Sequence, residues 1–133
     1  MLMGNREIQS ILDRHSIRPS RSLGQNFVTD PNIIRKIARL AEIGPTDQIL
    51  EIGAGFGALT CGLNEAKQIV AVEFDRYLIP ALKETLTNAE MLGKTELLHK
   101  DAMDIPWSEF FAMRPGQWKM VSNLPYNISS TLL

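Results

Sequence analysis

The sequence predicts an α/β fold, a doubly wound and mostly parallel sheet with helices on both faces. Short apolar runs, typical of strands that are buried on both sides, alternate with amphipathic segments between residues 48 and 122. The turn after the first run contains three glycines, Gly53, Gly55 and Gly57, where a strand passes into a helix. Strands that alternate with helices need crossover connections, and these make neighbouring strands parallel.

Two helices are predicted before the sheet begins. Asn5 is expected to cap a short first helix, and a basic loop follows over residues 16–26. Asp30 and Pro31 predict the start of the second helix, as an N-cap followed by proline in the first turn, and Gly44 ends it. The positions expected to face the core are Ile8, Ile11 and Leu12 in the first helix and Ile33, Ile34, Ile37, Leu40 and Ala41 in the second.

The predicted sheet has four strands joined by helical segments. The strands are expected over residues 48–52, 68–72, 96–99 and 118–122. The helical segments are expected over residues 58–65, from 76 to about 90, and over 108–113. Asp75 is expected to cap the longest of them. A sheet that ended soon after the fourth strand would leave an edge uncovered, so we expect the N-terminal part of a longer protein, truncated before its last strands.

Composition places the chain among soluble globular proteins. The 133 residues suffice for one core, with 44% hydrophobic and 22% charged residues. No apolar run is long enough to cross a bilayer, and the N-terminus lacks a secretory signal. Cys61 is the single cysteine, so an intrachain disulfide is excluded and a cytoplasmic location is expected. His15 and His99 are isolated, so no metal-ligand set is expected.

Charge divides the chain unevenly. Residues 1–39 carry seven Lys/Arg against three acids, a net +4, whereas residues 40–133 carry seven against twelve, a net −5. The excess of positive charge is compatible with phosphate contact near the N-terminal arm. We expect a basic N-terminal helix and loop over residues 1–30, followed by the main domain over residues 31–133.

The predicted strand ends carry residues suited to a nucleotide. The glycine loop lets the backbone approach a ligand closely, and Glu73 lies 20 residues beyond Gly53, where a carboxylate can accept from ribose hydroxyls. Asp101, at the third strand end, can accept from an adenine amino group. The spacing G-x-G-x-G by itself leaves a dinucleotide open. An adenosine pocket without an evident pyrophosphate clamp favours S-adenosyl-L-methionine as the cofactor.

The fourth strand is followed by Asn123, Leu124, Pro125 and Tyr126. The Asn123 side-chain oxygen and a nearby backbone carbonyl can accept both hydrogens of an exocyclic amino group. Pro125 fixes the carbonyl before it, and Tyr126 offers a face on which a base can stack. These residues predict chemistry on a base nitrogen beside the cofactor.

Five motifs in this order and spacing resemble the ribosomal RNA adenine N6-dimethyltransferases, most closely the type that acts on the bacterial small subunit. They are Leu23-Gly-Gln-Asn-Phe27, Glu51-Ile-Gly-Ala-Gly-Phe-Gly-Ala-Leu-Thr60, Val72-Glu-Phe-Asp75, Lys100-Asp-Ala-Met103 and Asn123-Leu-Pro-Tyr-Asn-Ile-Ser-Ser130. The resemblance implies a Rossmann-like class I methyltransferase domain without its C-terminal helical domain. It implies dimethylation of two adjacent adenosines near the 3′ end of small-subunit rRNA in a pre-ribosomal particle, by a monomer that needs no metal.

The resemblance also implies a role for each motif residue. Asn123 and the carbonyl of Leu124 would hold the target N6, and Tyr126 would stack on the target adenine. Asn26 and Val28 would contact the methionine end of the cofactor. The implied catalytic residues are Asn123, Leu124, Pro125 and Tyr126, and the implied cofactor-binding residues are Gln25, Asn26, Val28, Gly53, Gly55, Glu73, Asp101 and Asn123.

Three alternatives stand beside this reading. One is the related enzyme class that methylates large-subunit rRNA and confers antibiotic resistance, although Leu124 and the Ser129-Ser130 ending favour the small-subunit type. Another is a non-catalytic RNA-binding assembly factor of the same fold. The third is a nicotinamide dehydrogenase, which the glycine spacing and the motif at Asn123 both disfavour.

Overall fold

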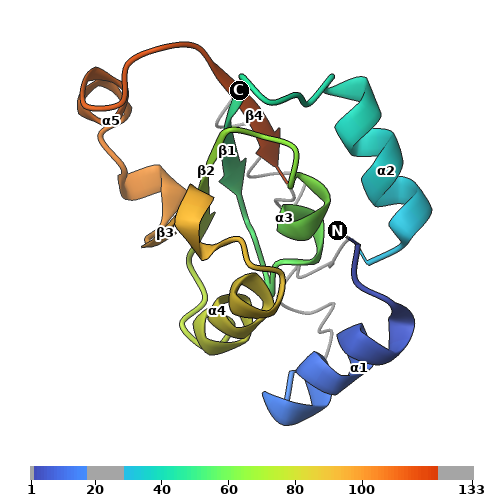
Figure 1. Ribbon diagram of the computed structural model, residues 1–133. Helices are drawn as coiled ribbons and strands as arrows, with labels where there is room; N and C mark the ends of the chain where they lie inside the picture. The colour runs from blue at the N-terminus through green and yellow to red at the C-terminus, as the bar shows by residue number, and fades with distance from the viewer. Residues whose placement is uncertain (1, 18–28, 123–133) are drawn as a thin grey trace.

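A four-stranded parallel sheet forms the centre of the computed structural model, which describes residues 2–17 and 29–122 (Figure 1). The strands are β1 (Gln48–Ile52), β2 (Gln68–Glu73), β3 (Thr95–His99) and β4 (Trp118–Ser122), in the order β3-β2-β1-β4. All three strand pairs are parallel, with Gln48 level with Gln68 and Trp118. The prediction of a parallel sheet is confirmed.

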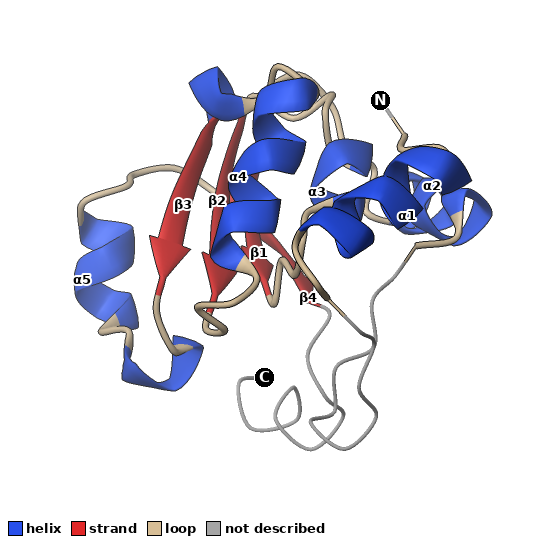
Figure 2. Ribbon diagram, turned by 90° about the horizontal axis from the view of Figure 1, so that it is seen from below, coloured by secondary structure: helices blue, strands red, loops and turns tan. Residues whose placement is uncertain are grey.

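Helices cover both faces of the sheet, as predicted (Figure 2). One face lies under α1 (Asn5–Arg14), α2 (Pro31–Leu40), α3 (Ala58–Gly62) and α4 (Ile79–Asn88), and α5 (Trp107–Ala112) lies on the other. The alternation of side chains in the strands supplies both cores. The first core takes Ile49, Ile69, Ala71 and Val121 from the sheet, and the second takes Leu50, Ile52, Val70 and Val72.

Helix α2 begins as predicted but buries less of its apolar surface than predicted. The Asp30 side chain accepts a hydrogen bond from the Asn32 backbone N–H at 2.9 Å, and Pro31 follows it. Ile34 is buried against Gly62 of α3, where a β-carbon would overlap the Ile34 side chain. Ile33 and Leu40 are exposed, Leu40 to 73%. The predicted stripe was too wide, because among the described residues Ile34 is buried and Ile37 is partly buried against the core, whereas Ile33 and Leu40 are not.

Several predicted boundaries shift by a few residues. The N-cap of α1 is Gly4 rather than Asn5, since Gly4 has the extended backbone of a cap. Helix α3 ends at Gly62 instead of residue 65, and α4 begins at Ile79 instead of residue 76. Asp75 does accept a hydrogen bond from a backbone N–H, that of Tyr77 at 2.9 Å, but it caps a turn that precedes the helix. In the described ranges, no helix is long and apolar enough to cross a membrane.

Candidate functional site

The carboxyl ends of the four strands point to one edge of the sheet (Figure 2). The glycine loop follows β1, Phe74 follows β2, and Lys100 and Asp101 follow β3. Open α/β sheets bind ligands in the crevice outside these ends. The structure therefore brings Gly53, Gly55, Glu73 and Asp101 to the edge where the sequence placed them.

The glycine loop turns sharply at the end of β1. The backbone N–H groups of Gly53 and Ala54 both donate to the Val72 carbonyl of β2, at 2.9 and 3.1 Å. Gly53, Gly55 and Gly57 have φ angles of +80°, +61° and +95°, in the left-handed region that favours glycine. The loop thus stays close to the end of β2 and presents backbone rather than side chains at these three positions.

Glu73 at the end of β2 is fixed by the backbone on both of its carboxylate oxygens. Its Oε1 accepts from the Gly55 N–H at 2.7 Å, and its Oε2 accepts from the Asp75 N–H at 2.9 Å. The residue is 8% exposed, and burial raises the pKa of its carboxyl while the N–H groups of Asp75 and Gly55 oppose the rise. Each oxygen has a second lone pair, so the carboxylate can accept further hydrogen bonds in a fixed orientation.

Asp101 lies beyond the end of β3. Its Oδ1 accepts from the Met103 N–H at 2.9 Å and so caps a single 3₁₀ turn, Ala102–Asp104. The Lys100 N–H donates to the Glu73 carbonyl at 3.2 Å, which ties this segment to the end of β2. Glu73 ends β2 and Asp101 lies beyond the end of the neighbouring β3, and the two strand ends are joined by this hydrogen bond.

Two exposed apolar side chains at this edge were not predicted as site residues. Phe74 directly follows Glu73 and is 67% exposed, and Met103 beyond β3 is also exposed. A large apolar side chain that stays in water at a ligand-binding edge offers a surface for a flat ring. The signal was present in the sequence, since Phe74 stands between two acids where the strand pattern ends.

Glu51 is a further carboxyl group that sequence reasoning passed over. It is fully buried in β1, where the Thr60 hydroxyl of α3 donates to its Oε1. Its Oε2 has no hydrogen-bond partner among the described residues. Burial raises the pKa of Glu51 to about 8, the Thr60 hydrogen bond opposes this, and the charge of Glu73 adds to it.

Seven of the predicted site residues lie outside the described residues. They are Gln25, Asn26, Val28, Asn123, Leu124, Pro125 and Tyr126. Their predicted roles therefore stay predictions. The described part does show that β4 ends at Ser122, which is level with Ile52 at the end of β1. Asn123 thus follows a strand that ends beside the glycine loop.

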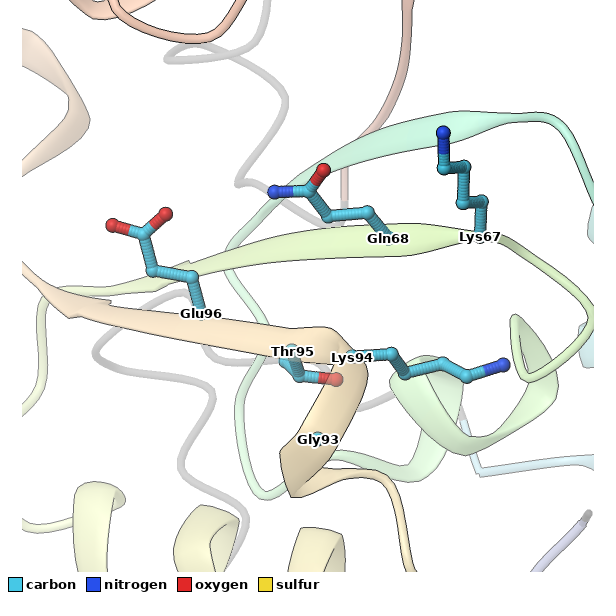
Figure 3. A pocket seen from close by; sticks show the side chains of 6 residues that line it. All are labelled: Lys67, Gln68, Gly93, Lys94, Thr95 and Glu96. Atoms are coloured by element: carbon cyan, nitrogen blue, oxygen red, sulfur yellow. The ribbon is translucent and has the colours of Figure 1, made fainter.

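A hollow of about 380 Å³ lies at the opposite edge of the sheet (Figure 3). Its lining residues are Lys67, Gln68, Gly93, Lys94, Thr95 and Glu96, at and before the starts of β2 and β3. The Lys94 ammonium is already bound by the carbonyls of Asn64 and Ala66, at 2.7 and 3.0 Å. This hollow is separate from the strand ends that carry the site. Residues 2–17 and 29–122 contain no cluster of three His, Cys, Asp or Glu suited to a metal ion.

Solved structures with the same arrangement define the class of the fold. A dimethyladenosine transferase from Plasmodium falciparum superposes with a TM-score of 0.66 at 31% identity, over 80% of this chain and 36% of that one. The 23S rRNA methyltransferase ErmE superposes with a TM-score of 0.65 at 30% identity, over 80% of this chain and 41% of that one. The fold is a Rossmann-like class I methyltransferase domain, as the resemblance implied.

The chain belongs to the ribosomal RNA adenine dimethylase family, whose sequence model matches residues 15–133. Two curated relatives share the name Ribosomal RNA small subunit methyltransferase A. The protein from Pelotomaculum thermopropionicum is 40% identical over 95% of this chain and 45% of its own length. The protein from Corynebacterium jeikeium is 41% identical over 99% of this chain and 43% of its own length. The chain thus spans less than half the length of these relatives.

Proposed function

We propose that this chain carries the cofactor-binding part of an enzyme that transfers methyl groups from S-adenosyl-L-methionine to adenine N6 in small-subunit rRNA. The proposed substrate is the pair of adjacent adenosines near the 3′ end, each methylated twice within a pre-ribosomal particle in the cytoplasm. The structural observation that supports it most is the carboxylate of Glu73, held beside the glycine loop by Gly55 and Asp75. The names of the curated relatives support the choice of RNA.

The described residues fit this cofactor. Glu73 keeps lone pairs for the two ribose hydroxyls, and the hydrogen bonds from Gly55 and Asp75 fix where they point. Phe74 offers an exposed ring at the same strand end for the adenine, and Asp101 can accept from the adenine amino group. Gly53 and Gly55 leave no side chain between the backbone and a ligand.

The proposed chemistry is direct transfer. When bound, the cofactor would supply a methyl group carried on a sulfonium sulfur. Transfer of that methyl group leaves a neutral thioether, so no metal is required. In the first transfer, Asn123 and the Leu124 carbonyl accept both N6 hydrogens, which favours a pyramidal nitrogen with its lone pair free to form the new N–C bond. Tyr126 stacks on the adenine, and Pro125 holds the carbonyl of Leu124. The methylated nitrogen releases its proton to water, so no strong general base is needed. Positioning of the two substrates therefore supplies most of the rate.

Calorimetric titration with S-adenosylhomocysteine tests the cofactor site. We expect the parent chain to bind and Glu73→Ala to lose at least tenfold in affinity, since both ribose hydrogen bonds disappear. Glu109→Ala is the matched control, because Glu109 is an exposed acid on α5, a helix that supplies none of the proposed site residues. Equal binding by the parent and Glu73→Ala would contradict the assignment of Glu73. Tighter binding of NAD than of S-adenosylhomocysteine would revive the dehydrogenase alternative.

Methyl transfer by the intact protein tests the catalytic assignment. We expect Asn123→Ala to abolish incorporation of labelled methyl into small-subunit particles while it spares binding of S-adenosylhomocysteine. Retained transfer by this variant would contradict the role of Asn123. The likeness to ErmE keeps the large-subunit alternative open to test, and preferential methylation of large-subunit rRNA would favour it.

A further inference from the structure

Tyr77 exposes its ring beside the proposed cofactor site. It follows Phe74 and Asp75 in the turn between β2 and α4, and it is 68% exposed. The side chain belongs to neither hydrophobic core. Its backbone is nevertheless fixed, because the Tyr77 N–H donates to Asp75 Oδ1 at 2.9 Å and the Leu78 N–H donates to the Asp75 carbonyl at 3.0 Å. The fold thus holds an aromatic residue at this edge without burying its ring.

Arg76 contacts both the hydroxyl and the ring of Tyr77. Its Nη2 donates to the Tyr77 hydroxyl at 2.8 Å, and its guanidinium carbon lies 4.9 Å from the centre of the Tyr77 ring. Arg14 and Arg114 are ion-paired to Glu84 and Glu96, whereas no ion pair joins Arg76 to a carboxylate in the described ranges. Among these residues no carboxylate is paired with the Arg76 guanidinium, and it keeps unused N–H donors at the surface.

This surface is attached directly to the proposed cofactor site. The Asp75 N–H donates to Glu73 Oε2, the carboxylate proposed to hold the ribose. Arg76 and Tyr77 come directly after Asp75 in the same turn. Lys100 is exposed at the neighbouring strand end, and its N–H donates to the Glu73 carbonyl. An aromatic ring and two cations thus lie on the rim of one edge of the sheet.

We propose that Arg76 and Tyr77, together with Lys100, form a second contact for single-stranded RNA outside the target-base pocket. Tyr77 stacks on an unpaired base, and the two cations bind the adjoining phosphates. Stacking suits any base, since each has a π-face, and arginine combines a charge with a flat surface that is weakly hydrated. The inference rests on the proposed function, because it assigns to the RNA substrate a surface beside that site.

Binding of a fluorescent single-stranded RNA of roughly ten nucleotides to the chain, followed by anisotropy, tests this contact. We expect Tyr77→Ala to weaken binding about tenfold, and Tyr77→Phe to stay within about twofold of the parent because the ring remains. Arg76→Ala should weaken binding and reduce its salt dependence. Lys67→Ala is the control, since it removes an exposed cation from the opposite edge of the sheet.

The outcomes separate this inference from the proposed function. Tyr77→Ala binding RNA as tightly as the parent, or Lys67→Ala losing as much affinity as Tyr77→Ala, would overturn the inference. So would a parent chain that binds S-adenosylhomocysteine but not the RNA, and the cofactor assignment would then stand. A parent chain that binds RNA through Tyr77 but not S-adenosylhomocysteine would contradict the proposed function and leave the RNA contact in place.

Discussion

The buried carboxyl of Glu51 makes the stability of the chain depend on pH. Its pKa rises from an ordinary value of 4.5 to about 8 in the folded chain. Between these values the folded chain keeps the proton and the unfolded chain has released it, so stability falls as pH rises. The stabilisation is fully present below about pH 4.5 and is lost by about pH 8. Burial of the charge outweighs the hydrogen bond from Thr60, which favours the ionised form.

Glu51→Gln should remove most of this pH dependence. The amide has a similar shape, keeps a partner for Thr60 and does not ionise. Urea unfolding at several pH values between 5 and 8 should show the parent losing up to about 1.4 kcal/mol per pH unit relative to the variant. Glu73 titrates in both proteins, so its own contribution largely cancels in the comparison. Parallel pH profiles of the two proteins would show that Glu51 is ionised in the folded chain.

Gly57 is the position in the glycine loop where an added side chain would meet the core. Its φ is +95°, and a β-carbon there would lie 2.9 Å from Leu82 Cδ1 and 3.0 Å from Thr85 Cγ2. Gly57→Ala should therefore lower the free energy of unfolding by about 1–3 kcal/mol, through strain and overpacking together. Gly93→Ala is the matched control, because nothing lies within 4 Å of its β-carbon position. Equal urea midpoints for both variants would contradict this account.

At the scale of the element, α2 depends on interactions at its two ends. Asp30 caps its first turn, and the Lys119 ammonium of β4 binds the carbonyls of Ala41 and Glu42, directly after its last residue, at 2.7 and 2.9 Å. Little of the helix is buried, so these end contacts supply a large part of its stability. The Lys119 contacts also connect the end of the helix to the sheet, since Lys119 comes from the strand beside β1.

Removing the cap should loosen this helix. Asp30→Ala is expected to lower the free energy of unfolding by about 1 kcal/mol, whereas Asp30→Asn should stay near the parent because Asn caps equally well. Thermal unfolding followed by circular dichroism measures both. A similar loss in the two variants would mean that the charge of Asp30 matters rather than its hydrogen bond to Asn32.

The predictable elements were those with a strong local signal. All four strands were found, two with the observed bounds, because continuous apolar runs between turn residues are distinctive. The starts of α1 and α4 and the end of α3 were displaced, since the backbone at Gly4, the turn around Asp75 and the early end at Gly62 depend on how the chain packs. Exposure of Leu40 likewise depends on what lies next to it, and periodicity does not report this.

At the scale of the molecule, sequence pattern predicted parallel strands and acids at their ends, and the structure supplies the strand order and the contacts. The order β3-β2-β1-β4 places Glu73 and Asp101 on neighbouring strand ends and β4 beside the glycine loop. The link from Gly55 through Glu73 to Asp75 joins residues from two strand ends, so no local pattern could predict it. The same holds for the pKa of Glu51, which depends on packing against α3.

The strand order also predicts how the molecule opens. Strands β1 and β2 have a paired strand on each side and a core on each face, whereas β3 and β4 each pair with one strand among the described residues. Amide hydrogen exchange should therefore be slowest in β1 and β2 and faster in β3 and β4, since edge amides open at lower free energy.

Exchange should also locate the cofactor by comparison with and without S-adenosylhomocysteine. Bound ligand should slow exchange at residues 53–57 and 73–75, which border the proposed pocket, and leave residues 93–95 at the opposite edge unchanged. Protection confined to residues 93–95 would instead place the ligand in the hollow lined by Lys67 and Lys94. If both edges became protected, the ligand would be stabilising the whole sheet. Loss of that protection in the Glu73→Ala variant would then still locate the binding site at the carboxyl edge.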